Sequence, residues 1–209
     1  MRLNRLSMSP SGRCTGRFRQ GRKRQKGSSL IEVLVTLVIL MLGLLGLVGL
    51  MVQSQRSQME SYQRVQALVL LEDMASRINI NRKAASCYAI TTAADGTPFL
   101  GNDYASTPTC ATGTAEQQAR AIADMSAWHS LLLGSAEKSG TSNVGAMLGA
   151  RGCVEAVAGF TGLYRVSVAW QGSSKTFAPP AEVVCAQNSY GDETQRRAVS
   201  INVQINSLN

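Results

Sequence analysis

The chain has 209 residues, enough for one domain with appendages, and a formal net charge of +8. The charge is unevenly distributed: residues 1–27 hold nine Lys or Arg and no acid, while the other 182 residues hold 12 bases and 13 acids. A nucleic-acid reader would carry its basic patch on the folded body, so we expect no nucleic-acid partner. The nine basic residues are Arg2, Arg5, Arg13, Arg17, Arg19, Arg22, Lys23, Arg24 and Lys26.

An apolar run follows this basic block. Residues 33–52 read VLVTLVILMLGLLGLVGLMV and contain no charged side chain. A helix of 20 residues is about 30 Å long, which matches the hydrocarbon core of a bilayer. Since no small-x-small cleavage site follows, we expect the run to be retained as a single membrane span. The basic flank predicts a cytoplasmic N-terminus and a periplasmic body.

One carboxylate, Glu32, stands at the start of this run. A charge near the centre of a membrane helix costs about 2.5–3.5 kcal/mol, and less towards its end. In the first helical turn, the macrodipole favours a negative charge by about 0.3–1 kcal/mol. Glu32 could therefore be a simple helix-start residue or a residue kept for a function inside the apolar environment.

Residues 53–82 contain neither Gly nor Pro and are rich in helix formers. We expect one helix from about residue 30 to about residue 82, whose half from 53 to 82 is amphipathic and packs on a globular head of residues 83–209. The predicted packing stripe consists of Tyr62, Val65 and Val69, widened by Leu68, Leu71, Ala75 and Ile78.

The head begins with a segment typical of a loop, residues 84–113, rich in Ala, Thr, Gly and Pro. Thr114 and Gln117 then have the spacing of a capping box, which predicts a helix that ends at Gly134. Its apolar side is predicted to include Ala119, Ile122, Trp128 and Leu132.

The periodicity then changes from that of a helix to that of strands. Alternation predicts strands at 163–171 and 196–208, with further candidates at 181–187 and 152–159. Short turns between them favour an antiparallel sheet with one buried face. The expected fold class is α+β, a long N-terminal helix packed on a small antiparallel sheet.

Four of the five cysteines lie beyond the apolar run, and Cys14 lies in the basic block. An even number in an exported region predicts two disulfides, for which three connectivities are possible. The pairing Cys87–Cys110 and Cys153–Cys185 is preferred because it closes the smaller loops. Their spacing is too wide for the CxxC pairs of zinc or redox sites.

The chain shows no sequence pattern of an enzyme. No HExxH, G-x-S-x-G or P-loop motif is present. His129 is the only histidine and stands beside Trp128 on a predicted helix, which favours a structural role. We therefore expect no catalytic residue, no metal and no cofactor.

The stretch Gly27-Ser28-Ser29-Leu30-Ile31-Glu32 resembles the processing site of type IV prepilins. The resemblance implies a leader of residues 1–27, cleavage between Gly27 and Ser28 by a prepilin peptidase, and methylation of the new amino terminus of Ser28. It implies a membrane or filament-core helix over 28–52 and makes Glu32 the fifth residue of the mature chain, which sets subunit register. The family most often has an aromatic residue at the position of Ser28, and Met8 is an alternative start to Met1.

Within this superfamily the chain resembles the PilV type of minor pilin, through segments at 30–47, 72–82, 127–133, 151–153, 166–172 and 190–200. This implies a role in initiation and tip assembly of type IV pili. The implied partners are other minor pilins, the major pilin, the inner-membrane assembly platform, a tip adhesin and membrane lipid. Two alternatives stay open: an I-type minor pseudopilin of a type II secretion system, and a single-pass inner-membrane sensor or enzyme with a ligand-binding head.

Overall fold

A computed structural model describes residue 27 and residues 29–104, 107–145 and 147–206. The basic block with Cys14, and the predicted methylation site Ser28, lie outside the described residues. The chain divides into two compact units at Val48 and Gly49, and helix α1 (Leu30–Ile80) contributes to both.

The first unit contains the apolar part of α1. The most apolar 18-residue window of α1 has a mean hydropathy of 2.9 and no buried side chain. By length and composition this helix could cross a membrane.

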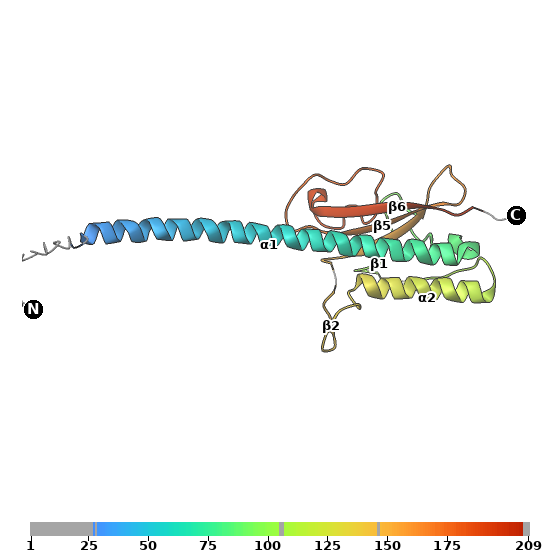
Figure 1. The fold of residues 1–209 in the computed structure, drawn as a ribbon. Helices are drawn as coiled ribbons and strands as arrows, with labels where there is room; N and C mark the ends of the chain where they lie inside the picture. Colours follow the sequence, from blue (N-terminus) through green and yellow to red (C-terminus); the bar gives the residue numbers. More distant parts are fainter. Residues whose placement is uncertain (1–26, 28, 105–106, 146, 207–209) are drawn as a thin grey trace, which may run out of the picture. The chain divides into compact units, whose positions relative to one another are not determined.

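The second unit contains a four-stranded antiparallel sheet in the order β1-β4-β5-β6 (Figure 1). The predicted strands at 152–159, 163–171 and 196–208 are present as β4 (Arg151–Ala156), β5 (Leu163–Gln171) and β6 (Arg196–Gln204). Three short strands were not predicted, because their segments show no alternation of apolar and polar residues. They are the edge strand β1 (Leu100–Gly101) and the two strands of a small hairpin, β2 (Lys138–Ser139) and β3 (Ser142–Asn143). The α+β fold class is confirmed.

Helix α2 (Ala115–Leu132) begins at the predicted capping box, in which Thr114 and Gln117 bond reciprocally. Gly134, at a φ of 81°, follows the last turn as predicted. The buried face of α2 includes Met125, Trp128 and Leu132, but Ala119 is exposed, so its predicted place on that face was wrong.

The core of the head forms between the C-terminal part of α1, helix α2 and the sheet. Figure 1 shows α2 alongside this part of α1, and the Trp128 indole N–H donates to the Leu70 carbonyl at 2.8 Å. The side chains that α1 buries there are Ala67, Leu70, Leu71, Met74, Ala75 and Ile78.

The predicted packing stripe was therefore only partly correct. Leu71, Ala75 and Ile78 are buried, whereas the other four side chains, Tyr62, Val65, Leu68 and Val69, are exposed. The buried side chains follow the helical period that starts at Ala67, and this face is rotated from the one that Tyr62, Val65 and Val69 define.

The predicted strand at 181–187 was wrong. This segment is a series of turns between β5 and the short helix η2 (Glu193–Gln195). Its carbonyls bond to a side chain in place of a neighbouring strand: the guanidinium of Arg196 donates to the carbonyls of Val183 at 2.7 Å and Cys185 at 3.2 Å. A second short helix, η1 (Arg82–Tyr88), lies in the segment after α1 that was expected to be loop.

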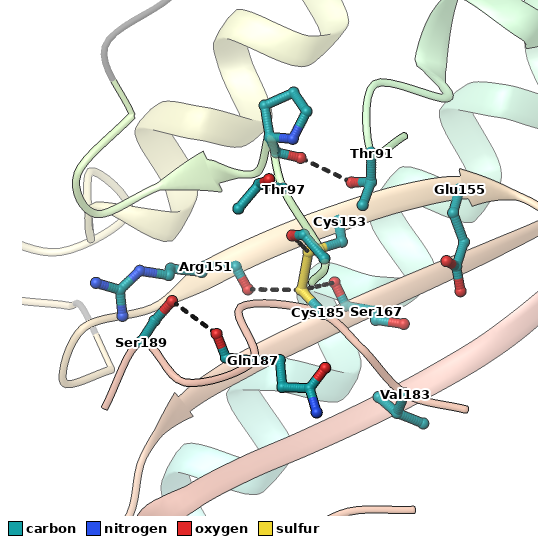
Figure 2. Close-up of a disulfide and its surroundings, with 12 residues drawn as sticks. Thr91, Thr97, Arg151, Cys153, Glu155, Ser167, Val183, Cys185, Gln187 and Ser189 are labelled. Atoms are coloured by element: carbon teal, nitrogen blue, oxygen red, sulfur yellow. Dashed lines mark hydrogen bonds between the residues drawn. A yellow bond between two sulfur atoms is a disulfide. The ribbon is translucent and has the colours of Figure 1, made fainter. Parts of the chain in front are cut away.

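Two disulfides link these segments, Cys87–Cys110 and Cys153–Cys185. They are the pairs that the sequence analysis preferred. The first ties η1 to the loop before α2. The second joins β4 to the turns that replace the expected strand, as Figure 2 shows, and both of its sulfurs are buried in the head.

Candidate functional site

The start of α1 places Glu32 in the first helical turn. The carbonyl of Ser29 accepts hydrogen bonds from the backbone N–H of Glu32 at 2.9 Å and of Val33 at 3.3 Å. The carboxylate therefore lies near the positive end of the helix dipole, which offsets part of its cost in an apolar environment.

Glu32 makes no salt bridge with any described residue. It is exposed and flanked by exposed apolar side chains, Leu30 at 78% and Ile31 at 67%. Within the described part of the chain, the carboxylate thus has apolar neighbours and no counter-ion.

The apolar surface of α1 continues from Glu32 without any cover from its own unit. Every side chain described between residues 29 and 48 is exposed. A Cβ added at Gly43 or Gly46 would meet nothing within 4 Å, so packing within this unit does not require glycine there. Soluble monomers rarely expose apolar patches beyond a few hundred Å², so this surface is built for lipid or for other subunits.

The predicted processing site is only partly described. Gly27 is exposed, and an added Cβ there would meet nothing within 4 Å. Cleavage between Gly27 and Ser28 stays a prediction, as does methylation of Ser28.

The head contains a buried polar cluster that sequence reasoning missed. Asp124 on α2 accepts hydrogen bonds from Arg77 at 3.0 Å and from the Tyr88 hydroxyl at 2.7 Å. Burial, followed by the bond to Asp124, raises the pKa of Tyr88. The cluster ties α1, η1 and α2 together, and Asp124 and Tyr88 are buried in it, which is typical of a structural role. The sequence did contain a signal for this cluster, because Asp124 is an acid on the apolar face of α2 that also carries Ala121, Met125 and Trp128.

His129 also has a structural environment. Its Nδ1 accepts a hydrogen bond from the Gly101 N–H at 3.0 Å, and its ring lies 5.4 Å from that of Tyr104. Burial lowers the pKa of His129. Among the residues described, no group of three or more His, Cys, Asp or Glu side chains could hold a metal ion.

Two family models match the chain. The prokaryotic N-terminal methylation motif matches residues 22–48, and the family described as type IV pilin Tt1218 matches residues 49–126. No curated protein and no solved structure gave a significant match.

The two matches adjoin each other and cover α1, η1 and most of α2. Together with the α+β fold they show that the chain belongs to the type IV pilin-like proteins, as its first residues indicated. Pilins are structural subunits that assemble with other pilins, and the methylation motif with its apolar helix is typical of a membrane-anchored precursor.

Proposed function

We propose that this pilin is a minor pilin of the PilV type, a non-enzymatic subunit that takes part in initiation and tip assembly of type IV pili. One observation carries the proposal. Glu32 is an exposed carboxylate in the first turn of an apolar helix, without a counter-ion among the described residues, close after Gly27.

The chemistry of assembly follows from this placement. A prepilin peptidase cuts after Gly27, and the new, methylated ammonium of Ser28 pairs with the Glu32 carboxylate of a neighbouring subunit. In a dry filament core an unpaired ion is penalised by about 3–5 kcal/mol relative to a paired one. A subunit that docks out of register leaves both charges unpaired, so the pair selects the correct register.

The basic leader prevents early assembly. While residues 1–27 remain attached, Ser28 has no free amine, and nine cations hold the chain to the cytoplasmic face of the inner membrane. Cleavage removes both obstacles. The head faces the periplasm, where it meets other minor pilins, the major pilin, the assembly platform and a tip adhesin.

A deletion strain tests the role. We expect loss of surface pili and of twitching motility, restoration of both by the wild-type gene in trans, and unchanged secretion of exoproteins. Normal pili with defective secretion would contradict the proposal and favour an I-type pseudopilin. Normal pili and normal secretion would contradict any assembly role and favour a membrane sensor.

A further inference from the structure

A hollow of about 410 Å³ lies where α1 ends. Three segments that are distant in the sequence meet there: Arg82 and Lys83 after α1, Thr161 and Tyr164 around the start of β5, and Asn206 after β6. The end of α1 and the segment after β6 both lie at the right of Figure 1. Small-molecule sites commonly occupy about 300–1,000 Å³, so the hollow has the size of a site for one or two small rings.

The charges in the hollow are of one sign. Arg82 and Lys83 are exposed and form no salt bridge with a described residue, and no acidic side chain lines the hollow. Elsewhere in the head, Arg77, Arg165 and Arg196 each hold a carboxylate. The fold therefore does not use the two cations of the hollow, and they are available to an anion.

Uncommitted hydroxyl groups lie beside these cations. The hydroxyls of Ser86, Thr161 and Tyr164 line the hollow and make no side-chain hydrogen bond to another described residue. Asn206 accepts one bond, from the Gln204 amide at 3.3 Å, and keeps its own N–H groups. Burial raises the pKa of Tyr164, so its hydroxyl stays a neutral donor and acceptor.

We propose that this hollow binds an acidic sugar residue, one that carries a carboxylate on a hydroxylated ring. The planar Arg82 guanidinium matches a carboxylate with two parallel hydrogen bonds, and Lys83 adds charge. The three hydroxyls and the Asn206 amide both donate and accept as ring hydroxyls require. The Tyr164 ring and Ile205 supply an apolar wall for the C–H face of the sugar. This site does not depend on the assembly role of the chain.

Binding is tested with the full chain in polyoxyethylene detergent micelles, which contain no sugar headgroup. The probe is trigalacturonic acid, the neutral comparison is a galactose trisaccharide, and the method is isothermal titration calorimetry. We expect saturable binding of the acidic probe and at least about tenfold weaker binding of the neutral one, as lost charge-assisted bonds require.

Variants then locate the site. The double substitution R82Q/K83Q should weaken binding at least about tenfold. The matched control R56Q/R64Q removes the same charge from exposed arginines of α1 that do not line the hollow, and should leave affinity unchanged. If the circular dichroism spectrum shows that the double variant is unfolded, single variants test the hydroxyls instead. Y164F removes the hydroxyl and keeps the ring, and T161V removes a hydroxyl on an exposed turn. Either should weaken binding of the acidic probe.

Three results would overturn the inference. Equal affinity for the acidic and the neutral trisaccharide would show that the carboxylate of the sugar is not recognised. Equal losses of affinity in R56Q/R64Q and R82Q/K83Q would show that binding depends on the overall charge of the protein and not on the hollow. Equally tight binding of sulfate or of hexaglutamate would show a general anion or acidic-peptide site, with no selectivity for the sugar ring.

Discussion

The two parts of α1 carry similar apolar side chains in opposite surroundings. Leu40, in the first unit, is 61% exposed, whereas Leu71, in the second, is 2% exposed. Residues 29–48 have no cover within their unit, while six side chains of the later part enter the core of the head. The apolar side chains of the first part are therefore suited to contacts with lipid or other subunits, whereas those of the second part pack in the core of the head.

Blocking the predicted cut should give the largest effect. Gly27→Leu adds a side chain where an added Cβ meets nothing within 4 Å, so the fold should be unaffected while the peptidase loses its glycine. We expect only precursor-sized protein on an immunoblot of membranes, and no incorporation into pili. Gly46→Ala is the matched control and should be processed normally. A mature-sized band for Gly27→Leu would contradict the processing account.

Removing the carboxylate of the first part comes next. Glu32→Ala should insert into the membrane normally, but its recovery in sheared pili should fall by at least about tenfold, because the partner ammonium is left unpaired. Glu32→Gln should behave similarly, since it keeps the shape and loses the charge. The control Glu72→Ala removes an exposed acid from the later part of α1 and should assemble normally. Wild-type recovery of Glu32→Ala would disprove the register role.

A pair of leucine truncations compares the two parts directly. Leu71→Ala should lower the free energy of unfolding of the head by about 2–5 kcal/mol, because it leaves a cavity in the core. Leu40→Ala removes the same atoms from an exposed position and should leave that free energy unchanged. Thermal unfolding monitored by near-ultraviolet circular dichroism measures both. Equal destabilisation would refute the division of α1 into two environments.

The smallest effect concerns pH and the head alone. Burial holds the pKa of His129 below its usual value of 6.5, so the unfolded state binds the proton more readily. The contribution of His129 to stability is present above pH 6.5 and is lost as the pH falls below it. The Tm of the head should decrease from pH 7 to pH 5.5, and His129→Gln should flatten this dependence. Since His129 is the only histidine, an unchanged slope in the variant would refute the assignment.

The sequence predicted those elements whose signal is local. The capping box at Thr114 begins α2, the alternation at 163–171 matches β5, and an uninterrupted run of helix formers gives α1. The apolar surface around Glu32 was also predictable, because an uncharged run of 20 residues is typical of a membrane-spanning helix.

Other features depended on contacts between distant residues. The wrong strand at 181–187 has apolar composition, but Arg196 and the bond to Cys153 hold it as turns. The buried side chains of α1, from Ala67 to Ile78, do follow a helical period. The predicted stripe also took in Tyr62, Val65 and Val69, and these stay exposed because of where the distant α2 and the sheet pack. The hollow beside Arg82 was missed for the same reason, since its three segments meet only in the folded head.

Mass spectrometry of the intact protein isolated from cells tests the central claim most directly. The account predicts a chain that begins at Ser28, carries one methyl group on its amino terminus and retains the apolar part of α1. A chain that keeps residues 1–27, or one that has lost the apolar segment altogether, would contradict it.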